Sequence, residues 1–209
     1  MSCNSTIECR VAKPPDSVLV MSALDSLPPM DFYGIASRRF RQAYVGQLLR
    51  DPMGILILAL DGLTRTPAGY IICLRDSRAF WLRLFLRHPI IVGRTLWIHK
   101  RATLLANLLD RSISPRSGAP SDPYIWSPTG PQAARVIFVG TAPQFRRRGI
   151  GLAMYRTLSE VLRSAGCRVV EAHIDHGNMS SLQLHMRAGW IVTQLPRGDY
   201  SAMLQLNSS

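Results

Sequence analysis

Three arginines precede two closely spaced glycines in the segment QFRRRGIG, residues 144–151. An apolar run typical of a strand lies before this segment, at 134–142, and a helical pattern follows it, at 149–166. The unpaired N–H groups and the dipole at a helix N-terminus attract anions, and glycine lets an anion approach the backbone. The segment therefore predicts a phosphate-binding turn. A solvated basic turn is the alternative that these residues alone leave open.

Two common phosphate-binding motifs do not fit this segment. The P-loop requires Gly-Lys-Ser/Thr, which does not follow the glycines. The dinucleotide-binding motif requires a third small residue at the position of Met154, and the chain beyond Gly151 is too short for a doubly wound sheet. The glycine pair by itself does not decide between the anion site and the basic turn.

A second motif lies downstream of the glycines. Asn178 is a suitable N-cap for a short helix that Gly189 ends. Together the two segments resemble the GCN5-related N-acetyltransferase (GNAT) superfamily, whose consensus is Arg/Gln-x-x-Gly-x-Gly/Ala and later Asn-x-x-Ala/Ser-x-x-Leu-Tyr-x-x-x-Gly-Phe. The matching residues are Arg146, Gly149, Gly151, Asn178, Ser181, Leu184, Gly189 and Trp190. The resemblance is specific over roughly 134–206 and looser upstream.

The resemblance implies an α/β protein with the GNAT fold, a mixed central β-sheet of six to seven strands flanked by helices. Patterns along the chain predict helices within 30–51, 78–113, 149–166 and 179–188, and strands at 17–23, 54–62, 68–76, 134–142, 167–175 and, as a pair, within 190–206. We expect a flexible leader at 1–16 and a single acetyltransferase domain at 17–209. Residues 78–132 are expected to form a helical, basic insert before the fourth strand, ending in a Pro/Ser/Gly-rich loop.

The resemblance also implies acetyl-CoA as co-substrate. In this family the backbone amides of the glycine loop hold the pyrophosphate, and the loop here consists of Arg146, Arg147, Arg148, Gly149, Ile150 and Gly151. Asn178 is a further residue expected to contribute to co-substrate binding. The preceding strand, at Val139 to Thr141, would pair with the pantetheine and leave the thioester carbonyl facing a backbone N–H. The acceptor amine would then attack the thioester directly while both substrates are bound.

Two histidines stand where the family places catalytic groups. His185 follows Asn178 by seven residues, the position of the family's tyrosine acid, and an imidazolium can protonate a thiolate. His173 precedes Asn178 by five residues, where some protein N-terminal acetyltransferases have a glutamate base. It shares a strand face with Glu171 and Asp175. A structural, hydrogen-bonded role is the alternative for each histidine.

Composition limits the class of protein. The 47% hydrophobic content fits one folded domain, and the net charge of +12 comes almost entirely from arginine, since only Lys13 and Lys100 are lysines. The four cysteines have no metal-ligand spacing, so we expect no metal. The first residues lack the apolar stretch of a secretory signal, and the apolar runs are too short to span a bilayer, so a cytoplasmic protein is expected.

The basic segment 78–113 has two interpretations. Its large apolar side chains either cover the sheet as part of the core or form a basic amphipathic surface that contacts anionic lipid at the inner membrane surface. From Arg75 to Arg116 there are nine lysine and arginine residues and only two aspartates, which is compatible with the amphipathic surface. Nucleic acid is disfavoured as a partner because no groove-reading motif is present.

The expected activity is transfer of an acetyl group from acetyl-CoA to a primary amine, with a small molecule such as an amino sugar as the acceptor. Two alternatives stay open. One is a degenerate GNAT fold that binds CoA as a sensor or regulatory module, favoured by the missing tyrosine at position 185. The other is a protein N-terminal or lysine acetyltransferase.

Overall fold

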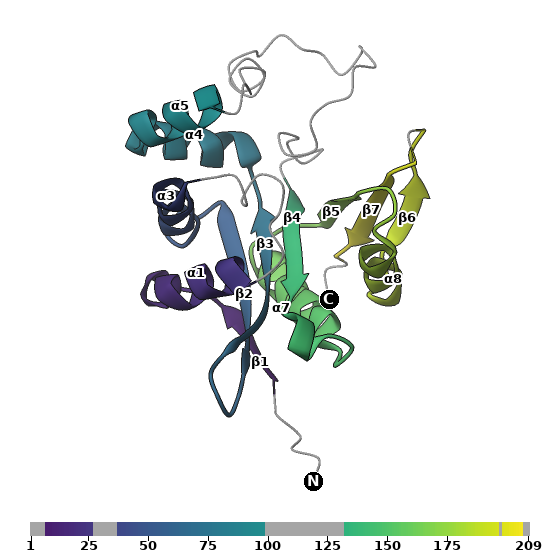
Figure 1. The fold of residues 1–209 in the computed structure, drawn as a ribbon. Coiled ribbons are helices and arrows are strands. Elements are labelled where there is room, and N and C mark those ends of the chain that lie inside the picture. The colour runs from purple at the N-terminus through teal and green to yellow at the C-terminus, as the bar shows by residue number, and fades with distance from the viewer. Residues whose placement is uncertain (1–6, 27–36, 99–131, 197, 207–209) are drawn as a thin grey trace.

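The computed structural model describes residues 7–26, 37–98, 132–196 and 198–206. The strands in these ranges form one seven-stranded mixed sheet in the order β1-β2-β3-β4-β5-β7-β6 (Figure 1). β4 and β5 are parallel, and every other neighbouring pair is antiparallel. The strands are β1 (Ile7–Val11), β2 (Gly54–Asp61), β3 (Pro67–Leu74), β4 (Ala133–Thr141), β5 (Val169–Ile174), β6 (Ile191–Gln194) and β7 (Tyr200–Gln205). The predicted mixed sheet of six to seven strands is confirmed.

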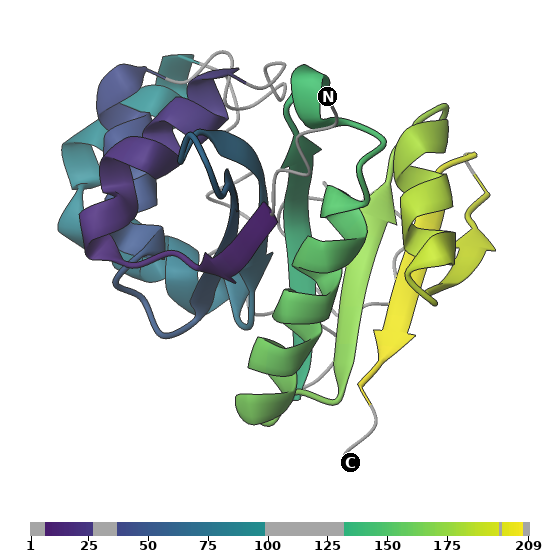
Figure 2. The same cartoon turned by 90° about the horizontal axis from the view of Figure 1, so that it is seen from below.

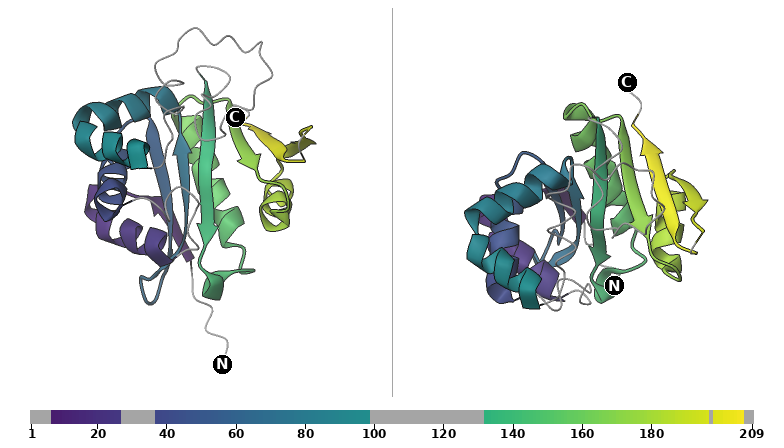
Figure 3. Two further views of the ribbon diagram at one scale, coloured as in Figure 1. Left: turned by 45° about the horizontal axis from the view of Figure 1, so that its top comes forward. Right: turned by 90° about the horizontal axis from the view of Figure 1, so that it is seen from above.

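Helices cover both faces of the sheet. The first four helices gather on one side of β2 and β3, and the fifth lies on the other side (Figures 2 and 3). The first four are α1 (Ser17–Ser26), α3 (Arg38–Leu48), α4 (Ser77–Arg87) and α5 (Pro89–Ile98). On the second side, α7 (Ile150–Ser164) crosses β1 to β4, and α8 (Met179–Arg187) packs on β6 and α7. Since both faces are covered, β2 and β3 are buried from their second residue onward.

Most predicted elements of the second half of the chain are confirmed within one or two residues at each end. β4, α7, β5 and α8 follow in the expected order, and β6 and β7 flank the expected turn. In the first half, β2 and β3 are the predicted antiparallel pair. α3 forms the later part of the helical region 30–51, and Ser37 caps it by accepting a hydrogen bond from the Phe40 N–H. Residues 30–36 lie outside the described ranges.

The N-terminal predictions were wrong in two places. Residues 17–23 form helix α1, not a strand, with Val20, Ala23 and Leu24 buried at helical spacing. A short apolar run fits either element, and packing decides. The expected leader 1–16 is ordered from Ile7 onward: β1 pairs with β2, and Arg10 makes two hydrogen bonds of 2.7 Å to the Asp16 carboxylate. Residues 1–6 lie outside the described ranges.

The basic segment begins as two helices, α4 and α5. Asp76 caps α4 by accepting a hydrogen bond from the Ala79 N–H. Phe80 and Leu84 are buried, and the Phe80 ring meets that of Tyr44 on α3 edge to face, 5.2 Å between centroids. These two apolar residues of the segment therefore belong to the core. Residues 99–131, which contain the rest of the expected insert, lie outside the described ranges.

Candidate active site

β4 and β5 run together for only part of their length. Their parallel pairing joins Ala133–Val136 to Val169–Ala172 and then ends, although β4 continues to Thr141. Figure 1 shows the two strands diverging below this point. The continuing half of β4 keeps its pairing with β3 on the other edge and is half-buried. Val139 and Thr141, predicted to face the co-substrate, lie on this half, so the edge that turns away from β3 can receive an extended ligand.

The arginine–glycine loop joins the end of β4 to the start of α7. After the short helix η2 (Pro143–Phe145), the backbone takes left-handed conformations at Arg147 (φ 61°) and at Gly149 (φ 76°), the N-cap of α7. A Cβ at Gly149 would meet nothing within 4 Å, so glycine is needed there for its backbone angle. No side chain caps α7, which leaves the first N–H groups of this helix facing the loop.

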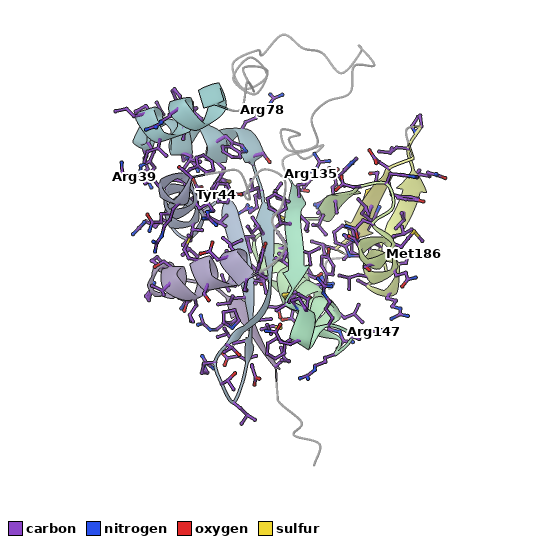
Figure 4. All side chains as sticks on the ribbon, viewed as in Figure 1. Arg39, Tyr44, Arg78, Arg135, Arg147 and Met186 are labelled. Carbon is purple, nitrogen blue, oxygen red and sulfur yellow. The ribbon has the colours of Figure 1, made fainter. Side chains whose placement is uncertain are left out.

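The three arginines of the loop are exposed and surround this helix end. Arg146 Nε lies 3.4 Å from the Thr141 carbonyl, and the Arg148 guanidinium lies over the Phe145 ring at 5.6 Å from its centroid. Arg147 stands at the same turn (Figure 4). Left-handed residues beside a helix N-terminus turn several N–H groups inward, which is the geometry of a backbone anion site. The loop thus has both the charge and the backbone shape for a phosphate.

Gly151 has a different role from Gly149. It is buried, and a Cβ at this position would lie 2.8 Å from Leu184 Cδ1 on α8. The missing side chain lets α7 and α8 approach each other. At the start of α8 the Asn178 side chain accepts a hydrogen bond from the Ser181 N–H at 3.1 Å, which confirms the predicted N-cap. The second motif therefore caps the start of α8 and places this helix against α7.

His185 lies in the interface between α7 and α8, and its exposed fraction is 1%. Its Nδ1 is 2.7 Å from the Ser181 carbonyl, which can only accept, so Nδ1 carries a proton and donates it. Nε2 of the neutral ring then accepts from the Tyr155 hydroxyl at 2.8 Å. The ring also meets Trp190 edge to face, 4.8 Å between centroids. Both nitrogens of His185 are therefore occupied within the protein.

Burial sets the protonation state of His185. Removal from water disfavours the imidazolium and lowers the pKa of His185, and the hydrogen bond to the Ser181 carbonyl opposes this only in part. Tyr155 is buried beside it, and burial raises the pKa of the Tyr155 hydroxyl. At neutral pH the pair is uncharged. This geometry favours the structural alternative for His185 over a proton donor to the co-substrate.

His173, unlike His185, lies in a partly exposed environment beside charged groups. It belongs to the half-buried face of β5, alternating with buried Ala172 and Ile174. Its Nε2 lies 3.8 Å from Asp175 Oδ1, the carboxylate neighbour that the strand pattern predicted. A second carboxylate, Asp199 Oδ2, lies at 3.5 Å. The site therefore has a histidine between two acidic side chains at the rim of the diverging strands.

Two residues of these clusters were missed by the sequence interpretation. Asp199 reaches His173 because β7 pairs with β5, with Ser201 opposite His173, and pairing register cannot be read from a turn sequence. Tyr155 lies four residues after Gly151, so the helical period could have placed it on the same buried face. Glu171, predicted to share the face of His173, lies opposite Arg135 of β4.

The described cysteines are poorly placed for nucleophilic catalysis. Cys73 and Cys167 are buried, and burial raises the pKa of the Cys73 thiol, which disfavours the reactive thiolate. Cys9 lies on β1, the edge strand three positions from β4. Within the described ranges, His, Cys, Asp and Glu side chains do not gather in groups of three that could hold a metal ion.

The buried His185 predicts a pH dependence of stability. Its pKa is lowered in the folded protein, so below about pH 6.5 the unfolded chain binds the proton more readily and stability falls. We expect the unfolding free energy of the wild type to decrease on acidification more steeply than that of His185→Gln, by up to ~1.4 kcal/mol per pH unit. Urea unfolding of both proteins across this range measures the difference. Equal slopes would contradict the buried neutral imidazole.

Comparisons with known proteins agree with these features. Residues 113–190 match the model of the acetyltransferase (GNAT) family. No curated protein matches the sequence at a significant level. Among solved structures, a GNAT-family acetyltransferase from Streptococcus pneumoniae has a TM-score of 0.56 at 12% identity, over 97% of this chain and 100% of the other.

Two further solved structures differ in the acceptors that their names give. An aminoglycoside acetyltransferase in complex with coenzyme A has a TM-score of 0.56 at 13% identity, over 96% of this chain and 95% of the other. A ribosomal-protein alanine N-acetyltransferase from Escherichia coli has a TM-score of 0.54 at 8% identity, over 98% and 96%. At these identities the likeness shows the fold. Residues 113–190 are therefore similar to the GNAT acetyltransferase family, and the chain has the fold of these proteins, which agrees with the resemblance.

Proposed function

We propose that the protein transfers an acetyl group from acetyl-CoA to the primary amine of a cationic small molecule, with both substrates bound at once. The observation that carries the proposal is the junction of β4 and α7. There a strand edge that has left its β5 partner leads directly into an uncapped helix N-terminus surrounded by three arginines. The fold supplies both halves of a site for a long ligand with a phosphate at one end.

The residues present fit acetyl-CoA. The N–H groups from Arg147 to Gly151 and the adjoining guanidinium groups would hold the pyrophosphate. The β4 edge from Val139 to Thr141 would hold the pantetheine by backbone hydrogen bonds, as an added strand does. When bound, acetyl-CoA supplies the acetyl group as a thioester, which an amine can attack without a protein nucleophile. The position of the cysteines agrees with this direct transfer.

His173 is the residue best placed to take the proton from the acceptor amine. Asp175 and Asp199 approach its Nε2 within 4 Å, so an imidazolium formed there would have two carboxylates beside it. The same carboxylates can attract an ammonium group, since the side chain of Asp175 is 74% exposed and that of Asp199 is 33% exposed. This local negative charge on a strongly basic protein supports a cationic acceptor.

His185 takes a positioning role in this proposal. Its Nε2 joins α8 to the Tyr155 hydroxyl of α7, and its Nδ1 donates to the Ser181 carbonyl within α8. Leu184 beside it packs on Gly151. The departing thiolate would then receive its proton from water or from the acceptor. A catalytic acid at position 185 remains the second candidate, because its spacing from Asn178 matches the family's tyrosine.

The class of acceptor is the most specific part of the proposal. The named acceptors of two proteins with this fold, an aminoglycoside and a ribosomal-protein alanine, include both a cationic small molecule and a protein N-terminus. The exposed carboxylates near His173 favour the small cation here. We expect thiol release from acetyl-CoA with aminoglycosides, amino sugars or polyamines, and less with peptides. Thiol release with peptides alone would indicate a protein acceptor instead of a small molecule. If no amine caused thiol release, the interpretation as a CoA sensor would be favoured.

The glycine loop gives a test of co-substrate binding that needs no acceptor. Gly149→Glu places a carboxylate in the open space at the start of α7, so we expect the affinity for acetyl-CoA to fall by more than about tenfold. Gly166→Glu is the matched control. Gly166 follows α7, has the same φ of 76°, and has equally open surroundings.

Both substitutions carry a similar cost of about 1 kcal/mol for the left-handed backbone, so stability alone cannot explain a difference between them. Isothermal calorimetry with acetyl-CoA should show binding for the wild type and Gly166→Glu, and weak binding for Gly149→Glu. Equal loss in the two variants, or a wild type that ignores millimolar acetyl-CoA, would contradict the site.

The base role of His173 predicts a pH-dependent defect. We expect His173→Ala to lower kcat/KM for the amine roughly 10²–10⁴-fold near neutral pH, and the deficit to shrink as pH rises and the free amine becomes abundant. Asp199→Asn should give a smaller defect of the same form. His88→Ala serves as the control, because His88 lies between α4 and α5, and its replacement is expected to leave the rate unchanged. A uniform loss at all pH values would instead indicate a structural His173.

A further inference from the structure

The outer face of α4 and α5 carries apolar side chains that the core does not use. Leu82 is 53% exposed, Leu86 is 68% exposed and Ile90 is 83% exposed. These residues are spaced four apart along the chain, and Leu82 and Leu86 are neighbours on one face of α4. Phe80, Leu84 and Val92 are buried on the opposite side of the same helices. Since those residues fix the helices on the core, the exposed leucines cannot turn inward.

The charged side chains that α4 and α5 themselves carry are all positive. Arg78, Arg87 and Arg94 are exposed on α4 and α5, and no Asp or Glu occurs from Ser77 to Ile98. The nearest carboxylate on α3's side, Asp51, is buried and paired with Arg83 at 2.6 Å. Exposed leucines between arginines that have no carboxylate partner among the described residues are typical of a surface that meets both acyl chains and anionic headgroups.

A groove of about 570 Å³ lies beside the apolar face, between α3 and the α4–α5 pair. On the side of α3 the groove is lined by Arg39, Gln42, Ala43, Gly46, Gln47 and Arg50. Arg87 and His88 line the opposite wall. No carboxylate contributes to the lining. The groove can therefore hold an anionic headgroup while the neighbouring leucines contact its lipid surroundings.

We propose that the α4–α5 face, with the adjoining groove of Arg39, Arg50, Arg87 and His88, docks the protein on the surface of a bilayer containing anionic phospholipid. Among the described helices none has the length and apolar character to cross a bilayer, so the contact is peripheral. Charge complementarity decides the occupant: a second copy of this chain would bring the same positive face, which repels. Nucleic acid would meet exposed aliphatic side chains, whereas its bases stack on aromatic ones.

The position of this face is compatible with catalysis at the proposed site. In Figure 4, Arg78 lies above the end of the sheet where β4 starts, and Arg147, in the glycine loop, lies toward the opposite end of that strand. A membrane contact through α4 and α5 leaves the glycine loop away from the lipid. The docked protein would act on amines at or near the bilayer surface, whichever acceptor it uses.

Vesicle co-sedimentation of the full chain tests the proposal. We expect binding to vesicles of phosphatidylglycerol in phosphatidylcholine, little binding to phosphatidylcholine alone, and weakening at raised ionic strength. Leu86→Asp and Ile90→Asp should each weaken binding by more than about tenfold, because each removes an inserted side chain and adds repulsion. Leu63→Asp is the matched control, since Leu63 is 71% exposed in the turn between β2 and β3.

The charge contribution is measured separately. Arg78→Gln and Arg94→Gln should each weaken vesicle binding about fivefold, and Arg163→Gln, at the end of α7, should not. Arg39→Gln with Arg50→Gln tests the groove, and soluble glycerol phosphate should compete only if the groove takes a single headgroup.

Three results would overturn the proposal. These are equal binding to neutral vesicles, vesicle binding that survives both aspartate substitutions, and a wild-type dimer that Leu86→Asp dissociates in the absence of lipid. All these residues are exposed, so circular dichroism can verify that each variant is folded. Calorimetry with acetyl-CoA, which the docking variants should bind as the wild type does, separates failure of docking from failure of the proposed activity.

Discussion

The parting of β4 from β5 is the constraint on which the proposed site depends. After four paired residues on each strand, β4 keeps one neighbour, β3, and loses the other. A strand edge inside a sheet exposes backbone donors and acceptors that need partners. The loop at the end of β4 reverses the chain into α7, so the same divergence sets the edge beside a helix N-terminus. Strand, loop and helix thus form one continuous binding surface.

The different roles of Gly149 and Gly151 follow from this arrangement. Gly149 supplies a backbone angle that opens the loop toward solvent, and Gly151 supplies a contact between helices that is closed to solvent. The sequence interpretation gave both glycines to the anion. A Cβ at Gly149 would meet open space, whereas a Cβ at Gly151 would meet Leu184. Gly151 maintains the position of α8, and through α8 the position of His185 and Trp190.

Local chemistry was sufficient to predict the C-terminal half of the fold. A turn glycine, an N-cap and a helical period each act within a few residues, so β4, α7, β5 and α8 could be placed from the sequence. The errors arose where distant segments decide. Residues 17–23 are helical because they pack on α3 and β3, and Ile7–Val11 is a strand because β2 offers an edge. The hydrogen bond to His185 Nε2 depends on Tyr155 of α7, and the second carboxylate near His173 depends on the β5–β7 register.

The contact between Gly151 and Leu184 has a consequence for how such a chain can change over time. A side chain at position 151 and a long one at position 184 would compete for the same volume, with only 2.8 Å available. A substitution at one position is therefore tolerated when the other becomes smaller, and is costly when it does not. Gly151 and Leu184 lie more than thirty residues apart in the sequence. In the folded protein the two motifs are therefore joined by this packing contact.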